Sequence, residues 1–206
     1  MRLSVNKSWI KSALSWTQRL LLASSAVMLG YCAFVLGDSW LFQWRARQEF
    51  ERRLRDIPAA KPAARQAAPA SIEPDGLIGR IDIPRIGLSA VVFEGTDKLT
   101  LRRAVGHIAY TPLPGRPGNA GLAAHRDSFF RPLKDISNDD LITVTTLRAA
   151  YRYRVVSMRV VRPTEVSVLL PTGDEILTLV TCYPFNFVGP APERFIVKAK
   201  RVLTSD

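Results

Sequence analysis

An uncharged apolar run near the N-terminus constrains this chain more than any other feature. Residues 20–37 read LLLASSAVMLGYCAFVLG, with no charged residue and no proline. A helix of this length, rising about 1.5 Å per residue, nearly crosses a hydrocarbon core of roughly 30 Å. Trp16 and Trp40 flank the run at positions suited to the two membrane interfaces. We therefore expect a transmembrane helix over residues 20–37.

Basic residues on the N-terminal side of this run indicate its orientation. Arg2, Lys7, Lys11 and Arg19 precede it with no acidic residue among them. The positive-inside rule then predicts a cytoplasmic N-terminus at residues 1–19 and an extracytoplasmic remainder. A cleaved signal peptide is the alternative, although no small-x-small cleavage site follows the run. The expected localisation is a single-pass cell-membrane protein.

The distribution of charge argues against a nucleic-acid-binding protein. The net charge is +11, but residues 71–206 hold 18 Lys and Arg against 14 Asp and Glu, leaving only +4 there. The remaining +7 lies in the first 70 residues, on either side of the apolar run. Basic clusters in that position favour anionic lipid headgroups. Because no stretch interleaves basic and aromatic residues, we expect membrane lipid as a partner and no nucleic acid.

Residues 38–71 are expected to join the membrane helix to a folded domain. A charged helical pattern continues over residues 40–54, and residues 57–71 then read IPAAKPAARQAAPAS. Such an Ala- and Pro-rich stretch has little to pack and is typical of a semi-extended linker. We expect it to hold a domain at residues 72–206 away from the bilayer.

The domain at residues 72–206 reads as short strands. Tyr151, Tyr153 and Val155 alternate with arginines, which is the pattern of a half-buried strand. A short helix over residues 97–104 and a helical turn over 129–136 interrupt the series. Many short strands separated by Gly- and Pro-containing turns favour an all-β barrel or sandwich. The expected strands cover residues 77–84, 88–93, 118–124, 141–146, 151–161, 176–181 and 195–203.

Cys182 is a lone thiol in this expected domain. The other cysteine, Cys32, lies in the apolar run, so the two are not expected to form a disulfide. An unpaired thiol is unusual in an exported domain and therefore suggests chemistry. Pro184 ends the strand that carries Cys182, and Arg194 begins the next strand after a Gly- and Pro-rich loop. We expect Cys182 and Arg194 to lie at facing ends of neighbouring strands.

His125 completes a possible catalytic set, because it also stands where a strand runs into a loop. A thiol with an ordinary pKa is mostly protonated at neutral pH, and an imidazole can take its proton or pair with the thiolate. The imidazolium can then protonate a leaving amine. A guanidinium at Arg194 would stabilise a tetrahedral oxyanion. Together the three side chains suffice for acyl transfer from a peptide.

The motifs around these residues resemble those of the sortase family, in the form found in class D. Residues 178–182 read TLVTC and are followed by Arg194, as in the family's TLxTC…R signature. Residues 114–133 read PGRPGNAGLAAHRDSFFRPL and are similar to the family's histidine block. Residues 79–86, GRIDIPRI, and 92–97, VFEGTD, are similar to its first strands. The resemblance covers about residues 76–202, with the order of motifs intact.

The resemblance implies an eight-stranded sortase-type β-barrel with short helices, preceded by the transmembrane helix. It also implies that Cys182 cleaves an LPxTG- or LPxTA-like C-terminal sorting signal of a secreted or surface protein and forms a thioacyl enzyme. An amine acceptor, from a peptidoglycan precursor or a pilin lysine, would resolve that intermediate. By the same transfer His125 is the acid/base, Arg194 binds the oxyanion or substrate, and Thr181 contributes to substrate binding.

Several alternatives stay open from the residues alone. A cysteine endopeptidase that hydrolyses surface peptides would use the same thioacyl intermediate, and a membrane-tethered binding domain would need none of the three side chains. His107 is expected to make a structural hydrogen bond rather than to act in catalysis. We expect no cofactor and no metal. Some sortases use calcium, but the candidate acids Asp139, Asp140, Asp174 and Glu175 read as turn and surface residues.

Overall fold

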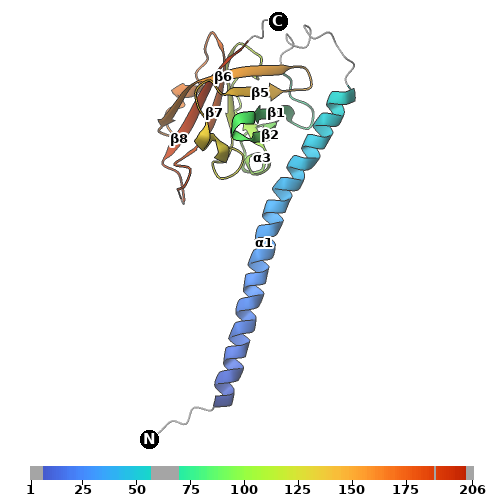
Figure 1. Cartoon of the computed structure of the whole chain (residues 1–206), viewed down its shortest axis with the longest axis vertical. Coiled ribbons are helices and arrows are strands. Elements are labelled where there is room, and N and C mark those ends of the chain that lie inside the picture. The colour runs from blue at the N-terminus through green and yellow to red at the C-terminus, as the bar shows by residue number, and fades with distance from the viewer. Residues whose placement is uncertain (1–6, 57–69, 188, 203–206) are drawn as a thin grey trace. The chain divides into compact units, whose positions relative to one another are not determined.

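The computed structural model describes residues 7–56, 70–187 and 189–202. It divides the chain into two compact units, Met1–Leu41 and Phe42–Asp206. The division falls inside the long helix α1 (Lys7–Asp56). Among the described residues, the N-terminal unit contains the first part of α1, whereas the second unit contains the last part of α1 and the strands (Figure 1).

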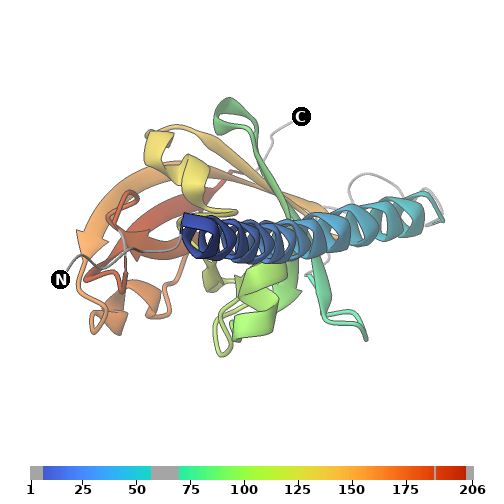
Figure 2. The same cartoon turned by 90° about the horizontal axis from the view of Figure 1, so that it is seen from below.

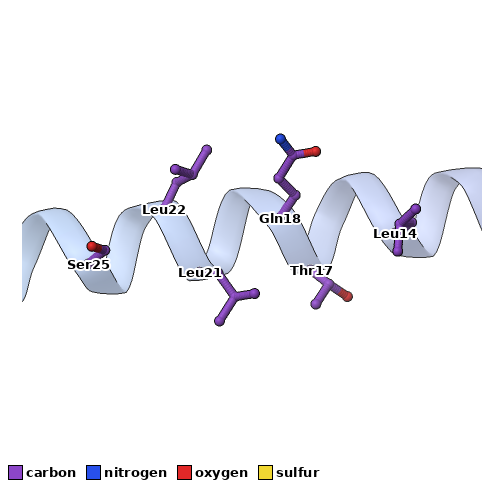
Figure 3. A pocket seen from close by; sticks show the side chains of 6 residues that line it. All are labelled: Leu14, Thr17, Gln18, Leu21, Leu22 and Ser25. Carbon is purple, nitrogen blue, oxygen red and sulfur yellow. The ribbon is translucent and has the colours of Figure 1, made fainter.

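The N-terminal part of α1 is the apolar helix that the sequence predicted. By length and composition one described helix, Leu14–Asp56, could cross a membrane, and its most apolar window has a mean hydropathy of 2.0 with none of it buried. In Figure 3 the labelled side chains between Leu14 and Ser25 all come from one stretch of α1 and point away from the helix in different directions. Leu21 and Leu22 are 65% and 63% exposed. Exposed apolar side chains of this kind are unfavourable in water and favourable in the hydrocarbon core of a lipid bilayer.

The second unit contains a closed barrel with the strand order β1-β2-β3-β4-β7-β8-β6-β5 (Figures 1 and 2). β5 pairs with β1 and closes the ring, so the expected eight-stranded barrel is confirmed. Closure leaves no open sheet edge. The strands are β1 (Leu77–Ile83), β2 (Leu88–Glu94), β3 (Val105–His107), β4 (Gly118–Ala123), β5 (Leu141–Thr145), β6 (Ala150–Val161), β7 (Glu175–Tyr183) and β8 (Glu193–Arg201).

The alternation predicted for β6 is present. Tyr151, Tyr153 and Val155 are buried, whereas Arg152 and Arg154 are exposed. The two tyrosines are among the largest fully buried side chains and belong to the main core of the barrel. Burial raises the pKa of Tyr153 to about 12, so its hydroxyl stays protonated.

One strand escaped the sequence prediction. β3 has three residues, pairs in parallel with β2 and antiparallel with β4, and places His107 in a strand rather than in a loop. Three residues are too few for an alternating pattern to be recognised, so only the pairing partners reveal the strand.

Short helices lie outside the strands (Figure 2). The expected helix is α3 (Lys98–Arg103), whose N-cap Asp97 accepts hydrogen bonds from two backbone N–H groups. The 3-10 helix η1 (Pro84–Ile86) ends at Gly87, which has a φ of +65°. The remaining 3-10 helices are η2 (Arg131–Asp135) and η3 (Val166–Leu169).

The last part of α1 belongs to the barrel unit. Phe50 is fully buried in a cluster with Leu77, Val91 and Ala104. Gln43 adds two hydrogen bonds, because its amide Nε2 donates to the carbonyl of Arg103 (2.6 Å) and its Oε1 accepts from the N–H of Val91 (3.1 Å). This packing buries one face of residues 42–56 against strands β1 and β2.

The compact unit therefore includes the last part of α1, from Phe42 on. The helix after the apolar run carries Phe42, Ala46, Phe50 and Leu54 on one face and packs there. The expected division, with a domain at residues 72–206 after a juxtamembrane helix and linker, stays a prediction. The Ala- and Pro-rich linker at residues 57–69 lies outside the described residues, so its conformation stays a prediction.

Candidate active site

Strands β7 and β8 bring Cys182 and Arg194 opposite each other. The antiparallel register pairs Cys182 with Arg194, as expected from their positions at facing strand ends. β7 ends one residue later, at Tyr183, because Pro184 has no N–H to continue the ladder. Cys182 is a free thiol and is half-buried. Its side chain is thus placed where the wall of the barrel meets a loop.

The parallel pairing of β4 with β7 brings His125 to the same end of the barrel. Ala123 pairs with Val180, and the N–H of Ala124 donates to the carbonyl of Val180 (3.3 Å). His125 is the second residue after the end of β4, and Cys182 is two residues beyond Val180 on β7. His125 is exposed, and its carbonyl accepts from the N–H of Phe130 (3.2 Å), the last residue of the turn that follows.

Thr181 locks the two strand ends together. It is buried, and its hydroxyl donates to the carbonyl of Ala124 (2.8 Å), the residue before His125. The bond joins the residue before the cysteine to the residue before the histidine. The geometry therefore gives Thr181 a positioning contact, while its predicted part in substrate binding stays a prediction.

Arg194 is held by the loop that precedes it. Its Nη1 donates to the carbonyls of Ala191 (3.2 Å) and Glu193 (2.8 Å), and the residue is half-buried. A guanidinium has five N–H donors in a planar fork. Within the described residues its other nitrogens have no protein hydrogen-bond partner, so they can donate to an oxyanion.

Arg126, next to His125, makes contacts that the sequence did not reveal. It follows His125 directly, and its Nη2 donates to the carbonyls of Phe187 (2.6 Å) and Gly189 (2.9 Å) in the β7–β8 loop. Its guanidinium also lies 5.8 Å from the centre of the Phe187 ring. Its Nη1 is buried without a partner among the described residues. Arg126 thus ties the turn after His125 to the loop between Cys182 and Arg194.

Three aromatic rings form the base of the same loop. Phe185 and Phe195 have ring centroids 5.4 Å apart, and Tyr183 lies 5.9 Å from Phe185. Phe185 and Phe195 also pack against the main core. Edge-on aromatic packing of this kind stabilises a fixed geometry. The loop therefore leaves and rejoins the barrel at a rigid base beside Cys182.

His107 lies in a structural hydrogen-bond network. It is 3% exposed, and its Nδ1 lies 2.7 Å from the Glu94 carboxylate. Its Nε2 lies 3.0 Å from the hydroxyl of Thr111 and 3.2 Å from the carbonyl of Pro112. Both ring nitrogens have protein partners, which agrees with the structural role expected for His107.

The four acids considered as calcium ligands form ion pairs. Asp140 is bound by the Arg85 guanidinium, and the pKa of this carboxyl is lowered mainly by that hydrogen bond. Asp174 lies 2.9 Å from Lys200. In the described ranges, no three His, Cys, Asp or Glu side chains gather into a group that could hold a metal ion.

Comparison with known proteins matches the barrel unit to one family. The Sortase domain family model matches residues 81–202. Over 189 residues, the chain is 30% identical to Sortase D of Bacillus subtilis, covering 88% of this chain and 96% of that protein. It is 27% identical over 176 residues to Sortase A of Listeria monocytogenes, covering 79% and 78%.

Solved structures show the same fold. A Clostridium perfringens Sortase D5 transpeptidase superposes with a TM-score of 0.62 at 28% identity, covering 75% of this chain and 94% of that one. Sortase C1 of GBS Pilus Island 1 superposes with a TM-score of 0.67 at 24% identity, covering 80% and 94%, which is evidence for the fold alone. The chain belongs to the sortase family, and class D is the class that its relatives in Bacillus subtilis and Clostridium perfringens represent.

Proposed function

We propose that this protein is a membrane-anchored sortase in which Cys182 attacks a sorting signal and transfers the cleaved protein to an amine. The observation that carries the proposal is the strand register at one end of the barrel. It pairs Cys182 with Arg194, and β4, which His125 follows, runs parallel to β7 as far as the pair Ala123 and Val180. Membership in a family of transpeptidases supports the same reaction.

The first step forms a thioacyl enzyme. The Cys182 thiolate attacks the carbonyl carbon of the Thr–Gly or Thr–Ala bond in an LPxTG- or LPxTA-like signal. Arg194 donates to the oxyanion of the tetrahedral intermediate, and its charge persists throughout the reaction. As the C–N bond breaks, the His125 imidazolium protonates the departing amine. The substrate protein then remains joined to sulfur through its threonine carbonyl.

The second step releases the product. Neutral His125 takes a proton from the acceptor amine as its nitrogen attacks the thioester carbonyl, and the C–S bond breaks to return the thiolate. The acceptor belongs to a peptidoglycan precursor or to a pilin lysine. If water attacks in place of the amine, the enzyme acts as an endopeptidase.

The apolar part of α1 supports an anchor in the cell membrane. Residues 20–37 carry no charge, and none of the most apolar window of the candidate membrane helix is buried in the folded chain. Basic residues precede the run, which favours a cytoplasmic N-terminus and an extracytoplasmic barrel. The expected division into residues 1–19, 20–37, 38–71 and 72–206 is retained for membrane topology, with the barrel unit beginning at Phe42.

The test is mass spectrometry of the full chain in detergent with a library of LPxTG and LPxTA peptides and an amine acceptor. We expect an acyl adduct on the peptide that contains Cys182, followed by transfer to the amine. Cys182→Ala should remove both signals, and Cys32 provides an internal control thiol that should stay unmodified. An adduct that only hydrolyses would support the endopeptidase. If no adduct forms with any peptide although iodoacetamide still alkylates Cys182, the result would contradict acyl transfer from these signals.

A further inference from the structure

The outer face of β4 and β7 continues from Cys182 along the barrel. Leu177 and Leu179 of β7 point into the main core, so the residues between and beyond them face outward. That outward stripe is Thr178, Val180 and Cys182. In the parallel neighbour β4, Asn119 and Gly121 lie beside this stripe.

The segment between β6 and β7 covers part of this face. Val168 of η3 is 4% exposed and packs with Val161 and Ile196, with Val180 partly buried against the same cluster. The approach is close, since a Cβ added at Gly121 would lie 3.0 Å from Leu169. η3 therefore forms a wall over the stripe that ends at Cys182.

Asn119 holds this wall in place. It is fully buried, and its Nδ2 donates to the carbonyls of Val168 (2.9 Å) and Leu170 (3.2 Å). Its Oδ1 accepts from the hydroxyl of Thr178 (2.6 Å), which fixes which way the amide points. Elsewhere in the described ranges, no barrel side chain hydrogen-bonds to residues 166–170.

We propose that Asn119, oriented by Thr178, is a positioning residue that fixes η3 as the wall of the substrate groove leading to Cys182. This inference rests on the proposed function. Asn119 lies among residues that face the same side as Cys182 but contacts none of the three proposed catalytic side chains. Its effect should therefore appear in peptide binding and not in the chemistry of the thiol. The carbonyls it holds would otherwise be left unpaired in a buried place, which is unfavourable.

The experiment measures kcat and KM for the best sorting peptide, the rate of Cys182 alkylation by iodoacetamide, and hydrogen exchange at residues 166–170. Asn119→Asp keeps the size of the side chain but removes both donors and turns a carboxylate toward two carbonyl oxygens. We expect KM to rise about tenfold, equivalent to about 1.4 kcal/mol. Both kcat and the alkylation rate should stay within about threefold of wild type, equivalent to about 0.7 kcal/mol, and exchange at 166–170 should become faster.

Two variants at Thr178 keep the inference testable if the Asn119→Asp variant does not fold. Thr178→Val removes the hydroxyl at nearly constant volume and should raise KM in the same direction, whereas Thr178→Ser keeps the donor and should restore it. Thr146 provides the matched control, because it is also buried, at 3% exposed, and its hydroxyl is hydrogen-bonded in the β5–β6 turn. Thr146→Val should lower stability and leave KM unchanged.

The outcomes separate this inference from the proposed function. An unchanged KM in Asn119→Asp and Thr178→Val, with unchanged exchange at 166–170, would overturn the inference. So would a loss of kcat with slower alkylation of Cys182, because Asn119 would then act on the nucleophile. If wild type turns over no peptide, the proposed function fails, and exchange at 166–170 in Asn119→Asp still decides whether Asn119 holds η3.

Discussion

Removing the Phe50 ring tests whether the last part of α1 stabilises the barrel unit. Phe50 is fully buried among Leu77, Val91 and Ala104, and Phe42, Ala46 and Leu54 pack beside it on the same helix. The sequence places Phe50 in a juxtamembrane stretch with no assigned packing. Because of this packing, Phe50→Ala should destabilise the barrel even though the whole linker separates Phe50 from the predicted domain in the sequence.

The expected cost follows from the burial. Truncating a fully buried phenylalanine to alanine costs about 3–5 kcal/mol, because transfer free energy is lost and a cavity remains. We expect about 3 kcal/mol, at the lower end, since a helix lying on a barrel can shift to close part of the cavity. With a urea slope of about 2 kcal/mol per molar, the unfolding midpoint should fall by about 1.5 M.

Pulse proteolysis of the full chain in detergent and increasing urea measures this midpoint on the surviving barrel fragment. Phe187→Ala is the matched control, since its ring is 44% exposed and its loss should cost less than about 1 kcal/mol. A fall of less than about 0.5 M in Phe50→Ala, or equal falls in the two variants, would refute the packing of residues 42–56 as a stabilising contact.

Three further predictions concern the site, a loop and the response to acid. Arg194→Lys should lose most transpeptidation, because an ammonium cannot reproduce the planar fork; full turnover would exclude a requirement for the guanidinium. Gly115→Ala should lower the free energy of unfolding in urea by about 3 kcal/mol or more, since φ there is +81° and a Cβ would overlap a buried tyrosine ring. Gly87→Ala is the control: φ there is +65° but the space is open, so the loss should be about 1 kcal/mol. The pKa of Asp140 is held below its ordinary value by Arg85, so this pair stabilises the fold above about pH 4 and loses its effect as pH falls. Asp140→Asn should therefore lower the free energy of unfolding in urea at pH 7 and reduce the loss of stability between pH 4 and pH 2. An unchanged dependence of stability on pH would contradict this role of the Arg85–Asp140 pair.

The soluble form of the enzyme should be designed from the structure and not from the predicted boundary. A chain that begins at residue 71 would lack Gln43, which donates to Arg103 and accepts from Val91. It would also expose the apolar surface that Phe50 covers. These contacts lie in the unit that begins at Phe42, so that residue marks the shortest sensible start.

The pattern of residues along the chain predicted an all-β barrel or sandwich, and the resemblance to sortases then implied the eight-stranded barrel and the proposed catalytic set. Alternation at Tyr151 and Tyr153 indicates a strand with one buried face, because side chains on a strand point to alternate sides. Pro184 marks the end of the strand that carries Cys182, because proline cannot donate to the ladder. Signals of this kind act over a few neighbouring residues and are therefore readable without a structure.

Only the tertiary structure decided how distant segments meet. β3 is too short for a periodic pattern and exists because β2 and β4 pair with it. Asn119 and Arg126 act on backbone carbonyls of residues about 50 and 60 positions away. A carbonyl is present at every residue and leaves no mark in the sequence, so such partners follow only from the register of the closed barrel. The sequence by itself predicted the proposed catalytic side chains, because their types and flanking motifs are local, and the fold decided which distant segments pack around them.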